Sequence, residues 1–170
     1  MTKFLLGVVI GIGLVLAASY LFVTRGGIFM GTDTKPSPWE RAIASAAISA
    51  SIGKSADDES PLPGDETNLV AGAKIYMEGC AGCHGQLDKP SAGAKRFYPH
   101  PPQLLPPNKG VTDDPVGATH WVVKNGIRFS AMPAATGKLS DSEIWQVALF
   151  LRNADKLPAS AQDALRQPQQ

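Results

Sequence analysis

Hydrophobic positions near the N-terminus form one uninterrupted run. From Phe4 to Val23 no residue is charged, and these twenty residues are about the number that an α-helix needs to cross the hydrocarbon core of a membrane. The run continues past Ala17-Ala18-Ser19, the small-residue site at which a signal peptide could be cleaved. Its length therefore favours a retained transmembrane anchor over residues 1–25, with a cleaved signal peptide as the alternative.

Residues 26–61 are predicted to form a connector after this anchor. A short helix is expected near residues 38–50, because Ser37 can cap its N-terminus and Pro38 suits its first position. An acidic, proline-containing linker, which is expected to be mobile, follows at residues 57–64. The helix lacks a basic polar face, so we expect its apolar face to dock on a protein rather than on a membrane surface. The apolar residues of that face recur at spacings of three and four: Trp39, Ile43, Ala46 and Ala47.

Three further segments have the features of amphipathic helices. Residues 65–67 offer caps for the first, which is predicted to run to about Glu78 and to end at Gly79. Gly72 within it leaves a gap in which another helix can approach closely. A middle helix is predicted between Pro115 and Gly126. Ser140 and Glu143 form a capping box for the last helix, which we expect to cross the first. Its apolar residues recur at helical spacing: Ile144, Val147, Ala148 and Leu151.

Length and charge narrow the possible functions. The chain has 170 residues, which is enough for one compact domain with appendages. Residues 158–170 are expected to form a polar C-terminal tail. The formal net charge is +1, so nothing indicates binding of nucleic acid. Between residues 62 and 157, ten Lys and Arg residues stand against nine Asp and Glu residues, so this region is nearly neutral.

The most specific chemical signal is the run Cys80-Ala81-Gly82-Cys83-His84, a C-x-x-C-H pattern that is typical of covalent attachment of a c-type haem. Each thiol can add to one vinyl group of the haem, and the histidine that follows can bind the iron. A structural zinc site would need a second pair of ligands, but the chain has only these two cysteines, and His100 and His120 are too far apart for the usual histidine half-site. A thioredoxin-like motif is disfavoured because no βαβ pattern surrounds it.

Three motifs occur in order along the chain: Gly72-x₃-Tyr76-x₃-Cys80-x-x-Cys83-His84, residues 125–134 (NGIRFSAMPA) and residues 143–151 (EIWQVALFL). Together they resemble a class I cytochrome c domain over about residues 62–157, similar to the membrane-anchored, single-haem members found with respiratory complexes. The resemblance implies a mostly α-helical class I cytochrome c fold around one covalently bound haem c and its iron, preceded here by one transmembrane helix. It also implies an electron carrier without substrate chemistry at the haem, so an enzyme is not expected.

The resemblance implies two axial ligands for the iron. His84 is the first, and we expect a backbone carbonyl of the proline-rich loop 97–107 to accept a hydrogen bond from its second ring nitrogen. Met132 is the second, because it lies in the matching loop motif and because a thioether is a soft, neutral donor that raises the reduction potential relative to a second imidazole. His100 and His120 are the rival ligands, which would give a bis-histidine haem.

The two propionates of a haem need solvent or charged partners. Arg128, in the ligand loop, is the first candidate for such pairing, followed by Lys124 and Trp121. The alternative for Arg128 is an ordinary exposed arginine. We expect His100 to be a loop residue that can reach a haem carboxylate, and His120 to be a partly exposed helix residue.

These features predict a membrane-anchored monohaem cytochrome c that carries single electrons between redox proteins of a respiratory chain. Haem of this class is attached outside the cytoplasm, so the haem domain is expected on the periplasmic side of a bacterial inner membrane, held by one spanning helix. A fixed haem c subunit of a larger respiratory or dehydrogenase complex is the alternative. A gas-binding haem sensor or a haem enzyme would instead require an open iron site.

Overall fold

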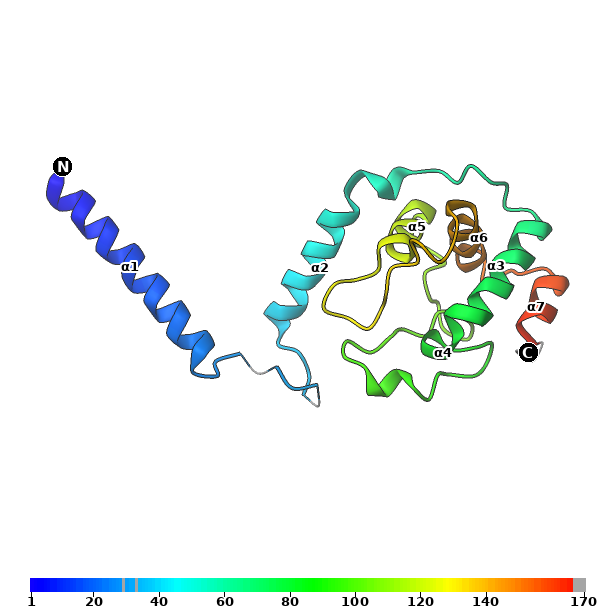
Figure 1. Cartoon of the computed structure of the whole chain (residues 1–170), viewed down its shortest axis with the longest axis horizontal. Helices are drawn as coiled ribbons and strands as arrows, with labels where there is room; N and C mark the ends of the chain where they lie inside the picture. Colours follow the sequence, from blue (N-terminus) through cyan, green and yellow to red (C-terminus); the bar gives the residue numbers. More distant parts are fainter. Residues whose placement is uncertain (29, 33, 167–170) are drawn as a thin grey trace. The chain divides into compact units, whose positions relative to one another are not determined.

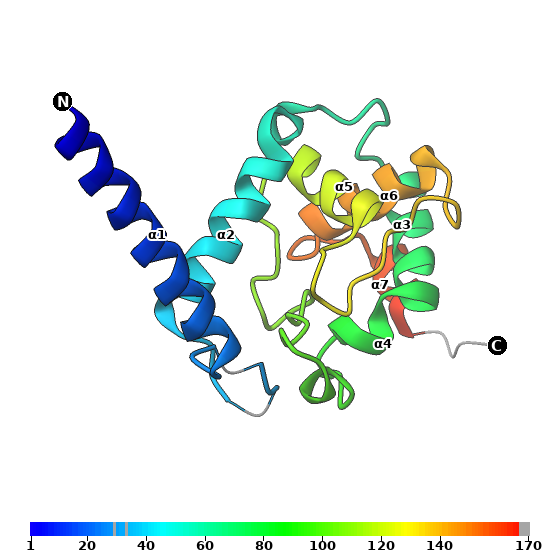
Figure 2. The same ribbon diagram turned by 60° about the vertical axis from the view of Figure 1, so that its left-hand side comes forward.

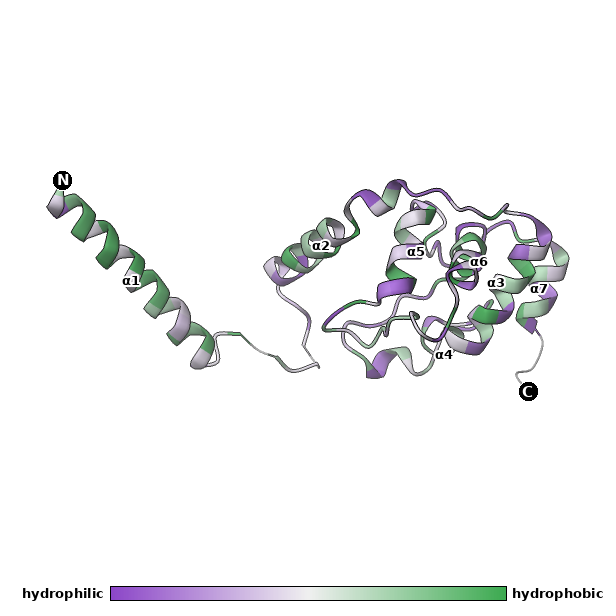
Figure 3. Cartoon of the chain, turned by 45° about the horizontal axis from the view of Figure 1, so that its top comes forward, coloured by the Kyte–Doolittle hydropathy of each residue, from purple (hydrophilic) through white to green (hydrophobic). Residues whose placement is uncertain are grey.

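The computed structural model describes residues 1–28, 30–32 and 34–166, which divide into two compact units, Met1–Lys35 and Pro36–Gln170. The first unit contains the helix α1 (Thr2–Thr24), in which no residue is buried. Figure 3 shows the ribbon of α1 coloured mainly as hydrophobic along its length, and the helix is long and apolar enough to cross a membrane. The helix therefore includes the whole uncharged run from Phe4 to Val23.

The second unit is helical throughout, apart from turns and loops (Figure 1). The part of the chain that the structure describes forms no strand beyond two isolated bridges, so the predicted mostly α-helical fold is confirmed. Its elements in chain order are α2 (Pro38–Ile52), the 3₁₀ turn η1 (Gly53–Asp57), α3 (Glu66–Gly79), α4 (Ala81–His84), the 3₁₀ turn η2 (Ala94–Arg96), α5 (Val116–Asn125), α6 (Asp141–Arg152) and α7 (Ala159–Arg166).

Local side-chain hydrogen bonds begin the two main helices. The Asp65 carboxylate accepts a hydrogen bond from the Asn68 amide (3.0 Å) and caps α3. The Ser140 hydroxyl accepts from the Glu143 amide (3.3 Å), while the Ser140 amide donates to the Glu143 carboxylate (2.7 Å). This reciprocal pair is the predicted capping box at the start of α6, and it satisfies two amides that have no partner within the helix.

Helices α3 and α6 cross at Gly72, where their backbones come into contact. A Cβ atom at Gly72 would overlap the Gln146 carbonyl oxygen and would lie 2.7 Å from the Phe150 Cβ, so only glycine fits here. One turn further along α3, the rings of Tyr76 and Phe150 pack with their centroids 5.4 Å apart. Both aromatic side chains are fully buried, and this crossing is the centre of the core.

The polar tail that the sequence predicted at residues 158–170 is, as far as Arg166, a helix of the folded unit; residues 167–170 lie outside the described residues. Helix α7 packs against α3, as Figures 1 and 2 show, and a hydrogen bond joins Ser160 to Glu66 (2.5 Å). The prediction was wrong because the segment is polar on average but apolar along one stripe. The buried residues of that stripe are Ala161, Ala164 and Leu165.

Helix α2 is two residues longer than expected and begins with the predicted cap. The Ser37 amide donates to the Glu40 carboxylate (2.6 Å), and the Ser37 hydroxyl donates to the same oxygen (2.8 Å). Trp39 and Ile43 are 50% and 62% exposed, so their apolar face has no partner within the described chain. Ile52, at the end of the helix, is half-buried.

Candidate functional site

The two cysteines lie on one helical turn directly after α3. The Cys80 carbonyl oxygen accepts hydrogen bonds from the amides of Cys83 (3.1 Å) and His84 (2.9 Å), so one turn carries both thiols and the imidazole. Both cysteines are free and half-buried. Burial, with a smaller contribution from Cys83, raises the pKa of the Cys80 thiol to about 11, so this thiol is protonated at neutral pH. Two thiols one turn apart are the arrangement that two thioether bonds to one haem require.

The His84 ring is held by the proline-rich loop. Its Nδ1 lies 2.8 Å from the Pro102 carbonyl oxygen, and the Leu104 amide donates to the His84 carbonyl oxygen (3.1 Å). The predicted hydrogen bond to a carbonyl of residues 97–107 is thus confirmed. With the proton on Nδ1, the imidazole keeps a lone pair on Nε2, which is the atom that binds a metal in such an arrangement.

Gln103 joins the proline-rich loop to the cysteine turn, a role that the sequence analysis missed. Its amide oxygen accepts from the Ser91 amide (2.7 Å), and its amide nitrogen donates to the Cys83 carbonyl oxygen (3.4 Å). Gly85 has a φ of 83°, and a Cβ atom there would overlap the Gln103 side chain. The sequence gives one signal for this role: Gln103 is the one amide side chain among the prolines and leucines of the loop 97–107.

Tyr76 supports the same turn from inside the core. Its hydroxyl donates to the Gly85 carbonyl oxygen (2.7 Å) and is buried. Burial, with a smaller contribution from Cys80, raises the pKa of Tyr76 far above its ordinary value, so the hydroxyl stays protonated and remains a donor. The residue before His84 is therefore held from the loop through Gln103, and the residue after it is held from α3 through Tyr76.

Met132 lies in a loop whose two ends are joined to the end of α5. Gly126 stops α5 with a φ of 67°, and the Ile127 amide donates to the Met132 carbonyl oxygen (3.2 Å). The Met132 amide donates to the Ser130 hydroxyl (3.1 Å). These bonds hold the Met132 backbone, and its side chain is half-buried.

The returning end of this loop bonds to α5 as well. The Ala135 amide donates to the Val123 carbonyl oxygen (3.1 Å). The Thr136 hydroxyl (2.7 Å) and amide (3.3 Å) both donate to the Lys124 carbonyl oxygen. These carbonyl oxygens belong to the last turn of α5 and have no partner within the helix. The returning end of the loop therefore supplies the hydrogen-bond donors that they lack.

Residues 67–151 match the protein family described as cytochrome C oxidase, cbb3-type, subunit III. The match spans half of the chain and includes the C-x-x-C-H motif and Met132. The chain belongs to this family of c-type cytochromes. The resemblance to a class I cytochrome c domain is thereby confirmed, and the family implies haem c with its iron and electron transfer by that haem. No curated protein and no solved structure matches the chain.

The donor set of this cytochrome domain fits a haem rather than a metal ion bound by side chains alone. Within the described residues, no group of three or more His, Cys, Asp or Glu side chains could hold a metal ion. Cys80, Cys83 and His84 lie instead on a single turn, where they would supply two attachment points and one nitrogen ligand to a haem. A thioether from Met132 would complete the set, because a porphyrin provides the remaining ligands itself.

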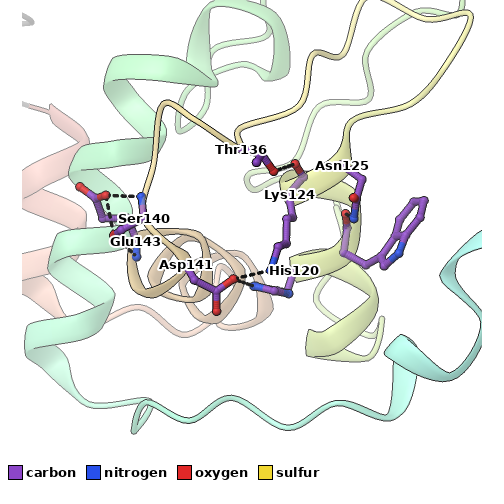
Figure 4. A network of polar contacts seen from close by, with 8 residues as sticks. His120, Lys124, Asn125, Thr136, Ser140, Asp141 and Glu143 are labelled. Atoms are coloured by element: carbon purple, nitrogen blue, oxygen red, sulfur yellow. Dashed lines mark hydrogen bonds and ion pairs between the residues drawn. The ribbon is translucent and has the colours of Figure 1, made fainter.

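The rival ligand His120 lies elsewhere in the cytochrome domain and is not partly exposed as predicted. It is 7% exposed and stacks on Trp145 with ring centroids 3.8 Å apart and planes inclined by 11°. Its Nε2 lies 3.2 Å from the Asp141 carboxylate, as Figure 4 shows. The expectation was wrong because a residue of α6, distant in sequence, covers the imidazole. Burial lowers the pKa of His120, and the Asp141 carboxylate opposes this only in part.

The other candidate side chains differ in whether they already have a hydrogen-bond or ion-pair partner within the protein. His100 Nδ1 lies 2.6 Å from the Phe97 carbonyl oxygen within its own loop. Lys124, proposed as a propionate partner, forms an ion pair with Asp141 (2.7 Å) instead. Arg128 is exposed and has no hydrogen-bond or ion-pair partner among the described residues, while Trp121 is half-buried. Arg128 is therefore the candidate that remains free to pair with a propionate.

Proposed function

We propose that this protein is a membrane-anchored monohaem cytochrome c that carries single electrons between redox proteins of a respiratory chain. The observation that carries the proposal is the His84 ring, which is oriented by Pro102 within the cysteine turn. Cys80 and Cys83 would hold the haem through two thioether bonds, and His84 and Met132 would bind its iron. The bound haem would supply a one-electron couple between Fe(III) and Fe(II).

The polypeptide would tune this couple rather than perform chemistry of its own. A thioether at Met132 favours Fe(II) relative to a second imidazole. The hydrogen bond to the Pro102 carbonyl makes the His84 imidazole a stronger donor, which acts in the opposite direction. If His84 and Met132 both bind the iron, no position would remain on it for a substrate, so we propose a carrier and not an enzyme.

The anchor and the haem together determine the proposed location. Helix α1 would span the bacterial inner membrane once, since it is apolar along its whole length. Haem of this class is attached outside the cytoplasm, so the unit that begins at Pro36 would lie on the periplasmic side.

The charge distribution favours an acidic docking partner. Residues 85–110 and 126–139, the loops that contain the Pro102 and Met132 sides of the site, carry six Lys and Arg residues and one Asp. The rest of residues 62–157 carries four Lys and Arg residues and eight Asp and Glu residues. A partner with negative charge around its docking site would be attracted to these two loops, and the association rate should fall as ionic strength rises.

A second candidate function is a fixed haem c subunit of a larger complex. The family description names an oxidase subunit, and the exposed Trp39 and Ile43 on α2 form an apolar surface that another protein could cover. Purification in mild detergent distinguishes the two functions. A stable particle of several subunits would support the fixed subunit, whereas a single chain that exchanges electrons in solution would support the carrier.

Haem attachment is tested by substituting the two thiols. We expect Cys80→Ala or Cys83→Ala to weaken haem staining on a denaturing gel, and the double substitution to abolish it, because each thiol supplies one covalent bond. An immunoblot of the same gel controls for the amount of protein. Undiminished staining of the double variant would refute the proposal.

A further inference from the structure

The segment that follows α2 lies directly on α5, although the sequence predicted a mobile linker from Asp57 onward. Gly117 in the first turn of α5 is buried, and a Cβ atom at this position would overlap the Ser55 carbonyl oxygen and lie 2.6 Å from the Asp58 carbonyl oxygen. Two backbones approach this closely only where one residue is glycine. Residues 53–58 therefore pack against α5 through their main chain.

Both ends of this segment have defined geometry. Gly53, with φ 50° and ψ −129°, turns the chain out of α2 into η1, a conformation that residues with a side chain rarely adopt. The Asp58 amide donates to the Ser55 carbonyl oxygen (3.3 Å) and ends the 3₁₀ turn. Figures 1 and 2 both show the chain passing beside α5 and then continuing to the start of α3.

Helix α5 is also held in place by its contacts with α6. The His120 ring stacks on Trp145 of α6. The Asp141 carboxylate accepts hydrogen bonds from His120 (3.2 Å) and Lys124 (2.7 Å), which Figure 4 draws as dashed lines. Helix α5 is thus held by α6 and by the connector, which packs residues 53–58 against Gly117 and also contacts α5 through α2.

The position of α5 determines where the Met132 loop begins and ends. The loop leaves α5 at Gly126 and returns to the carbonyl oxygens of Val123 and Lys124 through Ala135 and Thr136. A displacement of α5 would therefore move both ends of the loop together.

We propose that residues 53–58 act as a strap that positions α5 and, through it, the loop that contains Met132. The strap makes the connector part of the electron-transfer domain instead of a passive tether. The packing of the strap is independent of the haem, while its effect on the iron rests on the function proposed above.

Two substitutions in the full-length, detergent-solubilised protein test the strap from opposite sides. Gly53→Ala would strain the strap itself, and Gly117→Ala would push it away from α5. Gly64→Ala is the matched control, because a Cβ atom at Gly64 meets nothing within 4 Å. A Cβ atom at Gly53 meets nothing within 4 Å, so Gly53→Ala provides a second variant if Gly117→Ala prevents folding.

The first measurement is the rate of trypsin cleavage after Lys54, with cleavage after Arg25, an exposed residue of the other unit, as the internal reference. A docked strap must open before it is cut. We expect both test variants to be cut at Lys54 about tenfold faster, which corresponds to a loss of roughly 1.4 kcal/mol of docking free energy. We expect no change in Gly64→Ala. Unchanged cleavage at Lys54 in both test variants would overturn the strap.

The second measurement is the near-infrared sulfur-to-iron charge-transfer band of the oxidised protein, which reports methionine ligation. We expect the band to weaken in both test variants and carbon monoxide binding to the reduced protein to increase. Faster cleavage at Lys54 with an unchanged band would overturn the link to Met132. Absence of the band from the unsubstituted protein would contradict the proposed ligation, whereas the cleavage rates would still decide whether the strap exists.

Discussion

His84 is the residue whose environment most clearly separates a haem ligand from an ordinary surface histidine. Its Nδ1 is engaged by a carbonyl from a stiff, proline-rich segment, so the ring cannot rotate freely about its χ angles. Gln103 and Tyr76 hold the residues on either side of it. His100 and His120 have comparable hydrogen bonds, but these bonds direct their rings to Phe97 and to α6.

Met132→His should keep a six-coordinate haem and lower its reduction potential, because an imidazole favours Fe(III) more than a thioether does. Met132→Ala should open the iron to carbon monoxide. Redox titration and carbon monoxide spectra check the two outcomes, and Met77→Leu, a volume-conserving change in the core, serves as the control. If Met132→Ala leaves the spectrum and the potential unchanged, Met132 is not the ligand.

His120 should make the stability of the domain depend on pH. Burial lowers the pKa of folded His120 below the ordinary value of 6.5, so as the pH falls through 6.5 the unfolded chain takes up a proton before the folded chain does. The free energy of unfolding should therefore be fully retained above pH 6.5 and should decrease below it. Urea unfolding at several pH values checks this, and His120→Gln should show a shallower decrease. An equal decrease in both proteins would contradict the assignment.

At the scale of elements, the crossing of α3 and α6 positions the cysteine turn. The turn follows α3 without a break, so its position depends on how closely α3 packs against α6. Gly72 permits that close packing, and the Tyr76–Phe150 pair continues it toward Cys80. The cysteine turn thus receives its support from a helix that begins sixty residues later in the chain.

Gly72→Ala should destabilise the domain by about 1–3 kcal/mol, because the added methyl group would overlap the backbone of α6 at Gln146. Gly79→Ala, on the same helix, is the control, since a Cβ atom there meets nothing within 4 Å. Chemical unfolding of the two variants measures the difference. Equal free energies of unfolding in the two variants would contradict this prediction, because they would show that α3 and α6 can move apart without loss of stability.

At the scale of the whole molecule, the chain divides into an apolar helix and a helical unit with its own core. The sequence placed the start of the haem domain near residue 62, whereas the folded unit begins at Pro36. The difference arises because α2 and η1 contact α5.

We expect the full chain to fractionate with membranes, because α1 would expose about twenty apolar residues to water otherwise. A chain that begins at Pro36 behind a cleavable signal should be soluble and should retain its haem. Fractionation and haem staining measure both outcomes. Mature protein that starts near Tyr20 in a mass spectrum would show that the anchor is cleaved instead.

The sequence alone determined the features that depend on neighbours along the chain. The C-x-x-C-H motif, the caps at Asp65 and Ser140 and the end of α5 at Gly126 are all local signals, because each involves residues within one or two turns. The apolar run of α1 is local in the same sense.

Tertiary structure decided the features that depend on residues distant in sequence. His120 is buried because Trp145 covers it, α7 joins the core because α3 accepts its apolar stripe, and Gln103 joins two loops. The strap is the clearest case, because an acidic, polar segment packs through its backbone carbonyls against a glycine sixty residues away. Side-chain patterns predict burial of side chains, and they carry no information about a contact that main-chain atoms make.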